Sequence, residues 1–279
     1  MGSMLLDVLR EAAEAALTYL RSGRCSSRVV GRGSFGDVTK AFDKEAEDRA
    51  TEVLRMRLGS FLLVTEEAGV VKFGDSGRPE WVVIMDPVDG STNFDAGIPW
   101  TSVVLAGARW REGGVRVRDI EAAVVAEVFR DVTYEYSVEG GVKVNGAPPA
   151  RKDPPAKVLL GYFEVPEAYS VVPEYWRVRG RRAALRSLGS ASLDIVSVAL
   201  GRAEAFVDAR AKLRNVDVAA SLKMLLELGG NGIACVDGSL VGVDEIFIDR
   251  MVKLRCLAVG YDSRRYSQIT EAVKAALNL

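Results

Sequence analysis

Histidine is absent from the 279-residue sequence. This absence excludes a Ser-His-Asp triad, a histidine general base and every metal site that contains histidine. Any catalysis must therefore use carboxylates, hydroxyls, Lys, Arg, Cys or a bound ion. Cysteine is scarce as well, because Cys25, Cys235 and Cys256 form no CxxC pair and no zinc-binding pattern. Cys235 and Cys256 lie in apolar runs, so we expect buried thiols in a cytoplasmic protein.

The sequence also lacks a strong net charge and a long apolar run. Lys plus Arg total 37 against 38 for Asp plus Glu, which leaves a net charge of -1. Without a basic excess there is no electrostatic argument for binding nucleic acid or an anionic membrane. No apolar run approaches the roughly 20 residues that span a bilayer. We therefore expect neither nucleic acid nor a membrane as a partner.

Side-chain amides are few, since the chain has five Asn and one Gln, and Arg outnumbers Lys by 27 to 10. Amides are chemically labile at high temperature, so this composition is typical of a thermophile. A genome biased in base composition would also favour Arg, and that alternative stays open.

Composition and length indicate a globular protein with 48% apolar and 27% charged residues. A chain of this size fits one large domain or two closely packed lobes. Residues 147–155 contain four of the nine prolines. We therefore place a boundary there and expect an N-terminal lobe, 1–146, and a C-terminal lobe, 147–279, that together form a single catalytic unit.

Hydrophobic periodicity predicts a mixture of helices and strands, hence an α/β class, with a mostly antiparallel sheet in the middle of the chain. The predicted helices are 4–21, 43–58, 190–200, 218–228 and a last one from about residue 267. The predicted strands are 61–64, 81–85, 101–109, 122–129, 132–138, 157–162, 205–208, 232–236 and 254–259.

The most informative segment is Asp86-Pro87-Val88-Asp89-Gly90-Ser91-Thr92-Asn93-Phe94, at the end of an apolar strand. Its two carboxylates cannot bind phosphate directly, because like charges repel. A hard divalent cation between them resolves the conflict, and Mg²⁺ prefers such oxygen ligands. Gly90 allows a tight turn, after which the N–H groups at a helix start could hold phosphate. An ordinary acidic turn is the alternative.

Three further acidic segments fit this interpretation. Glu66 and Glu67 follow the strand 61–64, and if that strand pairs with 81–85, both acidic turns lie at one edge of one sheet. A solvated turn is the alternative for this pair. Asp217 precedes an apolar helix, and Asp43 precedes another. Each of these two could instead be a plain helix N-cap.

Four segments in this order resemble the inositol monophosphatase family, the lithium-sensitive, magnesium-dependent phosphatases that include fructose-1,6-bisphosphatases. They are 37–43, 66–67, 86–94 and 217–220, with further matches at 144–146 and 189–201. The resemblance covers nearly the whole chain. It implies a layered α-β-α-β-α sandwich, usually a homodimer, that hydrolyses a small phosphorylated substrate by direct in-line attack of water.

The resemblance also implies roles for individual residues. Metal ligands would be Glu66, Asp86, the carbonyl of Val88, Asp89 and Asp217, holding two to three Mg²⁺ ions, with Mn²⁺ as a substitute and Li⁺ as an inhibitor. Asp43 and Ser91, together with Glu66, would act on the attacking water. Substrate contacts would come from Asp89, Gly90, Ser91, Ser190, Ala191 and Asp208. Independently of the resemblance, Arg186 lies just before residues 187–190, so we expect it close to the sugar pocket as a further substrate contact.

The sequence departs from the usual family pattern at Val216, where Trp commonly precedes the last metal ligand, and in a longer segment at 208–214. Both features resemble the archaeal branch, whose members can hydrolyse inositol phosphate and fructose bisphosphate. The basic residues from Arg177 to Arg186 could bind a second phosphate or form a solvated face.

Two other functions stay open at this point. One is a related phosphatase of 3′-phosphoadenosine nucleotides or NADP, although members with nucleotide substrates tend to carry Lys where this chain has Thr92. The other is a non-catalytic binder of metal and phosphate.

Overall fold

A computed structural model describes residues 2–32, 38–75 and 77–279. The helices are α1 (Gly2–Leu20), α2 (Ala41–Leu58), α3 (Ser91–Ala96), α4 (Pro166–Arg179), α5 (Ala191–Ala199), α6 (Asn215–Glu227) and α7 (Ser263–Leu277). The strands are β1 (Val29–Arg32), β2 (Val38–Lys40), β3 (Phe61–Thr65), β4 (Gly69–Phe73), β5 (Trp81–Asp89), β6 (Ser102–Arg109), β7 (Ala122–Glu127), β8 (Thr133–Ser137), β9 (Gly141–Val144), β10 (Val158–Tyr162), β11 (Ala184–Arg186), β12 (Ala205–Asp208), β13 (Asn231–Val236), β14 (Ser239–Gly242) and β15 (Cys256–Gly260).

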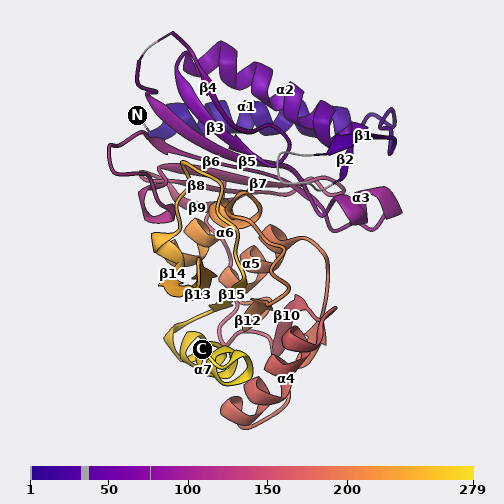
Figure 1. The fold of residues 1–279 in the computed structure, drawn as a ribbon, viewed down its shortest axis with the longest axis vertical. Helices are drawn as coiled ribbons and strands as arrows, with labels where there is room; N and C mark the ends of the chain where they lie inside the picture. Colours follow the sequence, from indigo (N-terminus) through magenta and orange to yellow (C-terminus); the bar gives the residue numbers. More distant parts are fainter. Residues whose placement is uncertain (1, 33–37, 76) are drawn as a thin grey trace.

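These elements form five layers, as predicted (Figure 1). Helices α1 and α2 cover the outer face of a 7-stranded sheet with the order β4-β3-β5-β6-β7-β8-β9. Helices α5 and α6 form the middle layer. A 6-stranded sheet with the order β11-β10-β12-β15-β13-β14 follows, and α4 and α7 cover its far face. The layered α-β-α-β-α sandwich is therefore confirmed.

The central strands of the first sheet are buried on both faces, which explains their continuous apolar sequences. In β5, Trp81 and Val83 point into the core shared with α1 and α2, whereas Val82 and Ile84 point into the core shared with α5 and α6. This alternation follows the two-residue period of a strand. The strand keeps its position between two helical layers because neither face tolerates polar groups.

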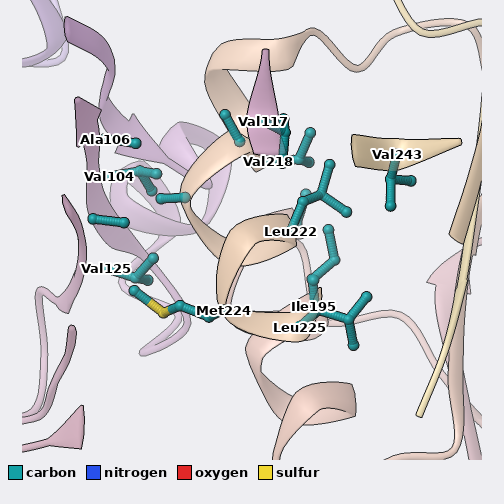
Figure 2. Packing of buried hydrophobic residues seen from close by; sticks show 14 of the residues in the cluster. Val104, Ala106, Val117, Val125, Ile195, Val218, Leu222, Met224, Leu225 and Val243 are labelled. Atoms are coloured by element: carbon teal, nitrogen blue, oxygen red, sulfur yellow. The ribbon is translucent and has the colours of Figure 1, made fainter. Parts of the chain in front are cut away.

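The middle layer is largely buried because it packs between two sheets. All nine residues of α5 are buried. In α6, Met224 points toward Val104 and Val125 of the first sheet, whereas Leu222 and Leu225 point the other way (Figure 2). This packing fixes the N-termini of α5 and α6 relative to the end of β5.

The second sheet and its outer helices share a separate core that includes both buried cysteines of the C-terminal half. Cys235 and Cys256 face each other across β13 and β15 as free thiols. The predicted burial of these thiols is confirmed. Among the described residues, no helix has the length and apolarity needed to cross a membrane.

The structure corrects several sequence predictions at element boundaries. Helix α2 begins at Ala41 and α6 at Asn215, so Asp43 and Asp217 are not N-caps but lie at the third helical position. Helix α7 begins at Ser263, four residues before the predicted start. The short edge strands β4, β9, β11 and β14 and the whole of α4 were not predicted. The helix start expected after Gly90 is that of α3. Residues 33–37, which include Asp37 at the start of the segment 37–43, lie outside the described residues.

Candidate functional site

The site begins where two parallel strands end side by side. Strands β3 and β5 pair in parallel, with Thr65 opposite Met85. Glu66 directly follows β3, and Asp86 directly follows Met85 in β5. Since parallel strands present their carboxyl ends at the same sheet edge, the two acidic side chains meet there. The predicted pairing of these strands is confirmed.

A third carboxylate reaches the same point from the middle layer. Carboxylate oxygens of Glu66, Asp86 and Asp217 all lie within 4.8 Å of one another. Burial raises the pKa of Asp86 well above its usual range, and neighbouring carboxylates, with Glu66 first, raise it further. The pKa of Asp217 is raised by burial and then by Glu66. Such mutual repulsion in a buried place is what a bound cation relieves, so the three residues suit a hard divalent metal ion.

Asp217 owes its position to the start of α6. Its Oδ2 accepts a hydrogen bond from the backbone N–H of Arg214, the N-cap residue, at 2.7 Å. This contact satisfies one of the N–H groups that a helix start leaves unpaired. The Arg214 guanidinium contacts Glu66 at 3.2 Å and so ties the helix start to the end of β3.

Asp43 shows the same local geometry at the start of α2. Its Oδ2 accepts from the backbone N–H of Lys40 at 3.3 Å. Burial raises the pKa of Asp43 to about 8, and Glu67 and Glu66 contribute to this increase. The buried Glu47, one turn further on, accepts a hydrogen bond from the Thr65 hydroxyl at 2.7 Å. Helix α2 thus brings two buried acids against the residues that follow β3.

Asp89 is the last residue of β5, and its carboxylate contacts the N-terminus of α5. Its carboxylate accepts from the N–H groups of Ala191 at 3.1 Å and Ser192 at 2.9 Å. The hydroxyls of Ser190 and Ser192 also donate to it. Burial raises the pKa of Asp89, while these donors oppose the increase. Ser190 therefore contacts the carboxylate of Asp89 directly.

Gly90 makes the turn from β5 into α3 with a φ of 91°. A Cβ atom at this position would lie 2.9 Å from the carbonyl oxygen of Gly189 and 3.0 Å from that of Trp100. Both the positive φ and these close contacts require glycine. The turn places the first residues of α3, beginning at Ser91, in the lining of a cavity.

These residues line one cavity of about 800 Å³. The lining includes Asp43, Glu66, Asp86, residues 88–93 from the end of β5 to the start of α3, Ala191 and Asp217. A second group in the lining consists of Tyr162, Glu164, Arg210 and Lys212, and Arg214 and Lys253 also line the cavity. The sequence analysis did not identify this second group. The alternating basic residues at 210, 212 and 214, just before Asp217, were the available signal.

Three predicted substrate contacts, Arg186, Ser190 and Asp208, lie outside the lining of this cavity, and Ser190 is fully buried. Arg186, on the edge strand β11, is exposed and donates to the carbonyl of its neighbour Leu185 at 2.7 Å. Asp208 is buried and accepts from Arg210, with Nε at 2.7 Å. It is Arg210, held by Asp208, that reaches the cavity.

The basic run from Arg177 to Arg186 is largely engaged in the outer helical layer. Arg179 is buried and forms an ion pair with the equally buried Glu204. Arg177 pairs with Glu174 on the surface of α4 at 2.8 Å. The structure therefore does not gather this run at the cavity.

Comparison with known proteins agrees with this geometry. The sequence model of the inositol monophosphatase family matches residues 3–270. The chain is similar to the inositol-1-monophosphatase of Aeropyrum pernix, with 37% identity over 221 residues, which is 76% of this chain and 77% of the relative. It is 33% identical to the fructose-1,6-bisphosphatase/inositol-1-monophosphatase of Thermococcus kodakarensis, over 82% of each chain.

A solved inositol monophosphatase-fructose 1,6 bisphosphatase has the same fold, with a TM-score of 0.73 and 27% identity over 97% of this chain and 98% of that chain. Members of this family depend on a metal ion, generally Mg²⁺, and act on phosphorylated small molecules. The chain therefore belongs to the inositol monophosphatase family and is a phosphoric monoester hydrolase.

Proposed function

We propose that the protein hydrolyses sugar and polyol phosphate monoesters in the presence of Mg²⁺, with inositol monophosphate and fructose 1,6-bisphosphate as substrates. The observation that carries this proposal is the meeting of Glu66, Asp86 and Asp217 within 4.8 Å in a cavity large enough for a hexose phosphate. The names of the relatives favour these two substrates.

The metal would be held by Glu66, Asp86, the carbonyl of Val88, Asp89 and Asp217, with two ions and a third, weaker one near Glu66. When bound, Mg²⁺ would activate water, neutralise phosphate charge and stabilise the leaving alkoxide. Mn²⁺ would substitute, and Li⁺ would inhibit. The raised pKa values of Asp86 and Asp217 support this assignment. Buried carboxylates that repel one another need a cation to stay ionised.

Asp43 and Ser91 would orient the attacking water and accept its proton. Both residues line the cavity. The bond from Lys40 occupies only part of the acceptor capacity of the Asp43 carboxylate, which leaves room for the Ser91 hydroxyl. Glu66 would assist from the metal side. Attack would be in line, without a phosphoenzyme, and labelled solvent oxygen should enter phosphate in one step.

The substrate phosphate would bind at the backbone of Gly90 and Ser91, where the start of α3 offers N–H groups. The polyol would lie against Asp89 and Ala191. Arg210, positioned by Asp208, adds a cation to the cavity lining. Ser190 would act through Asp89, and a contact from Arg186 would require its side chain to leave the Leu185 carbonyl.

We further propose a cytoplasmic homodimer whose subunit consists of the lobes 1–146 and 147–279. The first sheet lies wholly within 61–144 and the second within 158–260, which supports a boundary between them.

The test is a substrate panel with and without Mg²⁺. We expect the highest kcat/KM for inositol 1-phosphate or fructose 1,6-bisphosphate. A strong preference for 3′-phosphoadenosine 5′-phosphate or NADP would instead assign the nucleotide phosphatase function. Binding of metal and phosphate without hydrolysis of any substrate would contradict the proposal.

A further inference from the structure

Glu164 differs from the other acidic residues of the cavity in its surroundings. It lies between β10 and α4, and its charged contacts are Arg210 and Lys212. The Arg210 guanidinium donates to Glu164 Oε1 at 2.9 Å, and Lys212 Nζ lies 3.5 Å from Oε2. One exposed carboxylate is thus shared by two cations that line the cavity.

The two cations differ in freedom. The Arg210 side chain is 12% exposed and forms an ion pair with the buried Asp208. Its Cζ atom lies over the Tyr162 ring, 3.9 Å from the ring centroid. These contacts fix the direction of its guanidinium. The Lys212 side chain is 66% exposed, and within the part of the chain that the structure describes its one ion-pair partner is Glu164, at 3.5 Å. Arg210 is therefore a preformed donor, whereas Lys212 can follow a ligand.

The charges of Glu164, Asp208, Arg210 and Lys212 balance one another. Arg210 and Lys212 carry two positive charges, and Asp208 and Glu164 carry two negative ones. Partial burial raises the pKa of Glu164, but Arg210 and then Lys212 lower it by more, so the carboxylate stays ionised at neutral pH. A ligand anion that approaches the two cations must compete with this carboxylate.

We propose that Glu164 is a specificity-determining residue, which occupies the Arg210–Lys212 cation pair and must give it up to the second phosphate of a bisphosphate substrate. This inference rests on the proposed function. A monophosphate has no group that competes with Glu164, so its hydrolysis does not depend on that residue. Glu164 therefore sets the ratio between bisphosphatase and monophosphatase activity, in favour of monophosphates.

The test is Glu164→Gln, assayed with fructose 1,6-bisphosphate and inositol 1-phosphate. Gln keeps the size and a carbonyl acceptor for Arg210 but removes the competing charge. We expect KM for the bisphosphate to fall about three- to tenfold, as is typical for one partly exposed charge. KM for the monophosphate should stay within about twofold. Because the prediction is a gain, loss of folding cannot imitate it. If the bisphosphate is not turned over, its inhibition constant against inositol 1-phosphate replaces KM.

Glu167→Gln is the matched control. Glu167 lies in the first turn of α4 and is exposed. Its substitution by Gln changes the net charge of the protein by the same amount as Glu164→Gln. It should leave both KM values unchanged. In a second control, Lys212→Gln should remove most of the gain when combined with Glu164→Gln.

An unchanged or higher bisphosphate KM in Glu164→Gln, or an equal gain from Glu167→Gln, would overturn the inference while leaving the proposed function intact. A wild-type protein that hydrolyses neither substrate would overturn the proposed function, and the inference with it.

Discussion

Two charged groups line the cavity, and we call them the acidic end and the basic end. In the acidic end Glu66, Asp86 and Asp217 hold carboxylates within 4.8 Å of one another, whereas in the basic end Arg210 and Lys212 share the carboxylate of Glu164. The first group carries excess negative charge, which Arg214 offsets only in part. The second group is balanced by residues of the chain itself. The acidic end therefore needs an ion from solution before it can meet a phosphate, and the basic end needs none.

This difference separates the requirement for metal from the choice of substrate. Changes at the acidic end should affect hydrolysis of every phosphate monoester. Changes at the basic end should affect only substrates that reach it. The predictions below test this separation, beginning with the largest expected effect.

Asp86→Asn removes the most central carboxylate of the acidic end. We expect kcat to fall by about four orders of magnitude or more on every substrate, because phosphate and leaving group lose their cation. The fold should persist, since Asn keeps the size and can still accept from the Val88 N–H. Steady-state kinetics and a thermal melt measure the two effects. A variant with a tenth of wild-type kcat would show that Asp86 is not a metal ligand.

Asp43→Asn tests the group that would act on water rather than on metal. We expect kcat to fall about 10²- to 10⁴-fold, as for loss of a general base, with KM and the Mg²⁺ dependence nearly unchanged. Asn can still accept from the Lys40 N–H, so α2 should remain intact. Circular dichroism serves as the control. Unfolding of the variant would favour a purely structural role for Asp43.

Asp217→Asn tests whether the helix start contributes a ligand or only a cap. The Asn carbonyl can keep the bond to the Arg214 N–H, so the capping function survives. We expect the Mg²⁺ concentration for half-maximal activity to rise about 10- to 100-fold or more. A metal titration identical to that of the wild type would assign Asp217 to capping alone.

The metal-free protein should lose stability as the pH rises. The pKa of Asp43 is raised from 3.8 to about 8 in the folded state, so folding favours the protonated carboxyl group. The free energy of unfolding therefore falls as the pH rises from about 4 to about 8. Asp86 and Asp217 are shifted in the same direction. We expect the Tm in chelator to be several degrees lower at pH 8 than at pH 5. Asp43→Asn should flatten this dependence, and Mg²⁺ should reduce it; a Tm that rises with pH in chelator would contradict the account.

The smallest effects should come from the basic residues. Lys212→Gln should raise KM for fructose 1,6-bisphosphate about three- to tenfold with little change for inositol 1-phosphate. Arg186→Ala should change either KM by less than about threefold, because its side chain lies outside the cavity lining. A larger effect from Arg186 than from Lys212 would indicate that the second phosphate binds beside the edge strand β11.

Two members of the acidic end were predictable from the sequence, because the pairing of two strands determines their position. Two short apolar strands that each end in acid, 61–64 and 81–85, require only parallel pairing to bring Glu66 and Asp86 together. Asp217 was predictable through the family resemblance, but its place inside α6 was not. A carboxylate at the third helical position bonds to the N-cap N–H, and in sequence it resembles a cap itself.

The basic end could not be predicted from the sequence in the same way. Glu164 and Arg210 are 46 residues apart, and their contact depends on how the connections after β10 and β12 turn toward each other. The edge strands were missed because they are short and half-exposed, so their alternation is weak. Arg186 appeared close to the sugar pocket because it precedes residues 187–189 of the lining, yet on an edge strand successive side chains point to opposite faces.

The central claim is that the acidic end works only with a divalent cation. The most direct measurement is phosphate release from inositol 1-phosphate after removal of metal with a chelator, followed by titration with Mg²⁺. The account predicts no release above background without the ion and recovery of full activity as Mg²⁺ is restored. Undiminished release by the chelated, metal-free protein would contradict it.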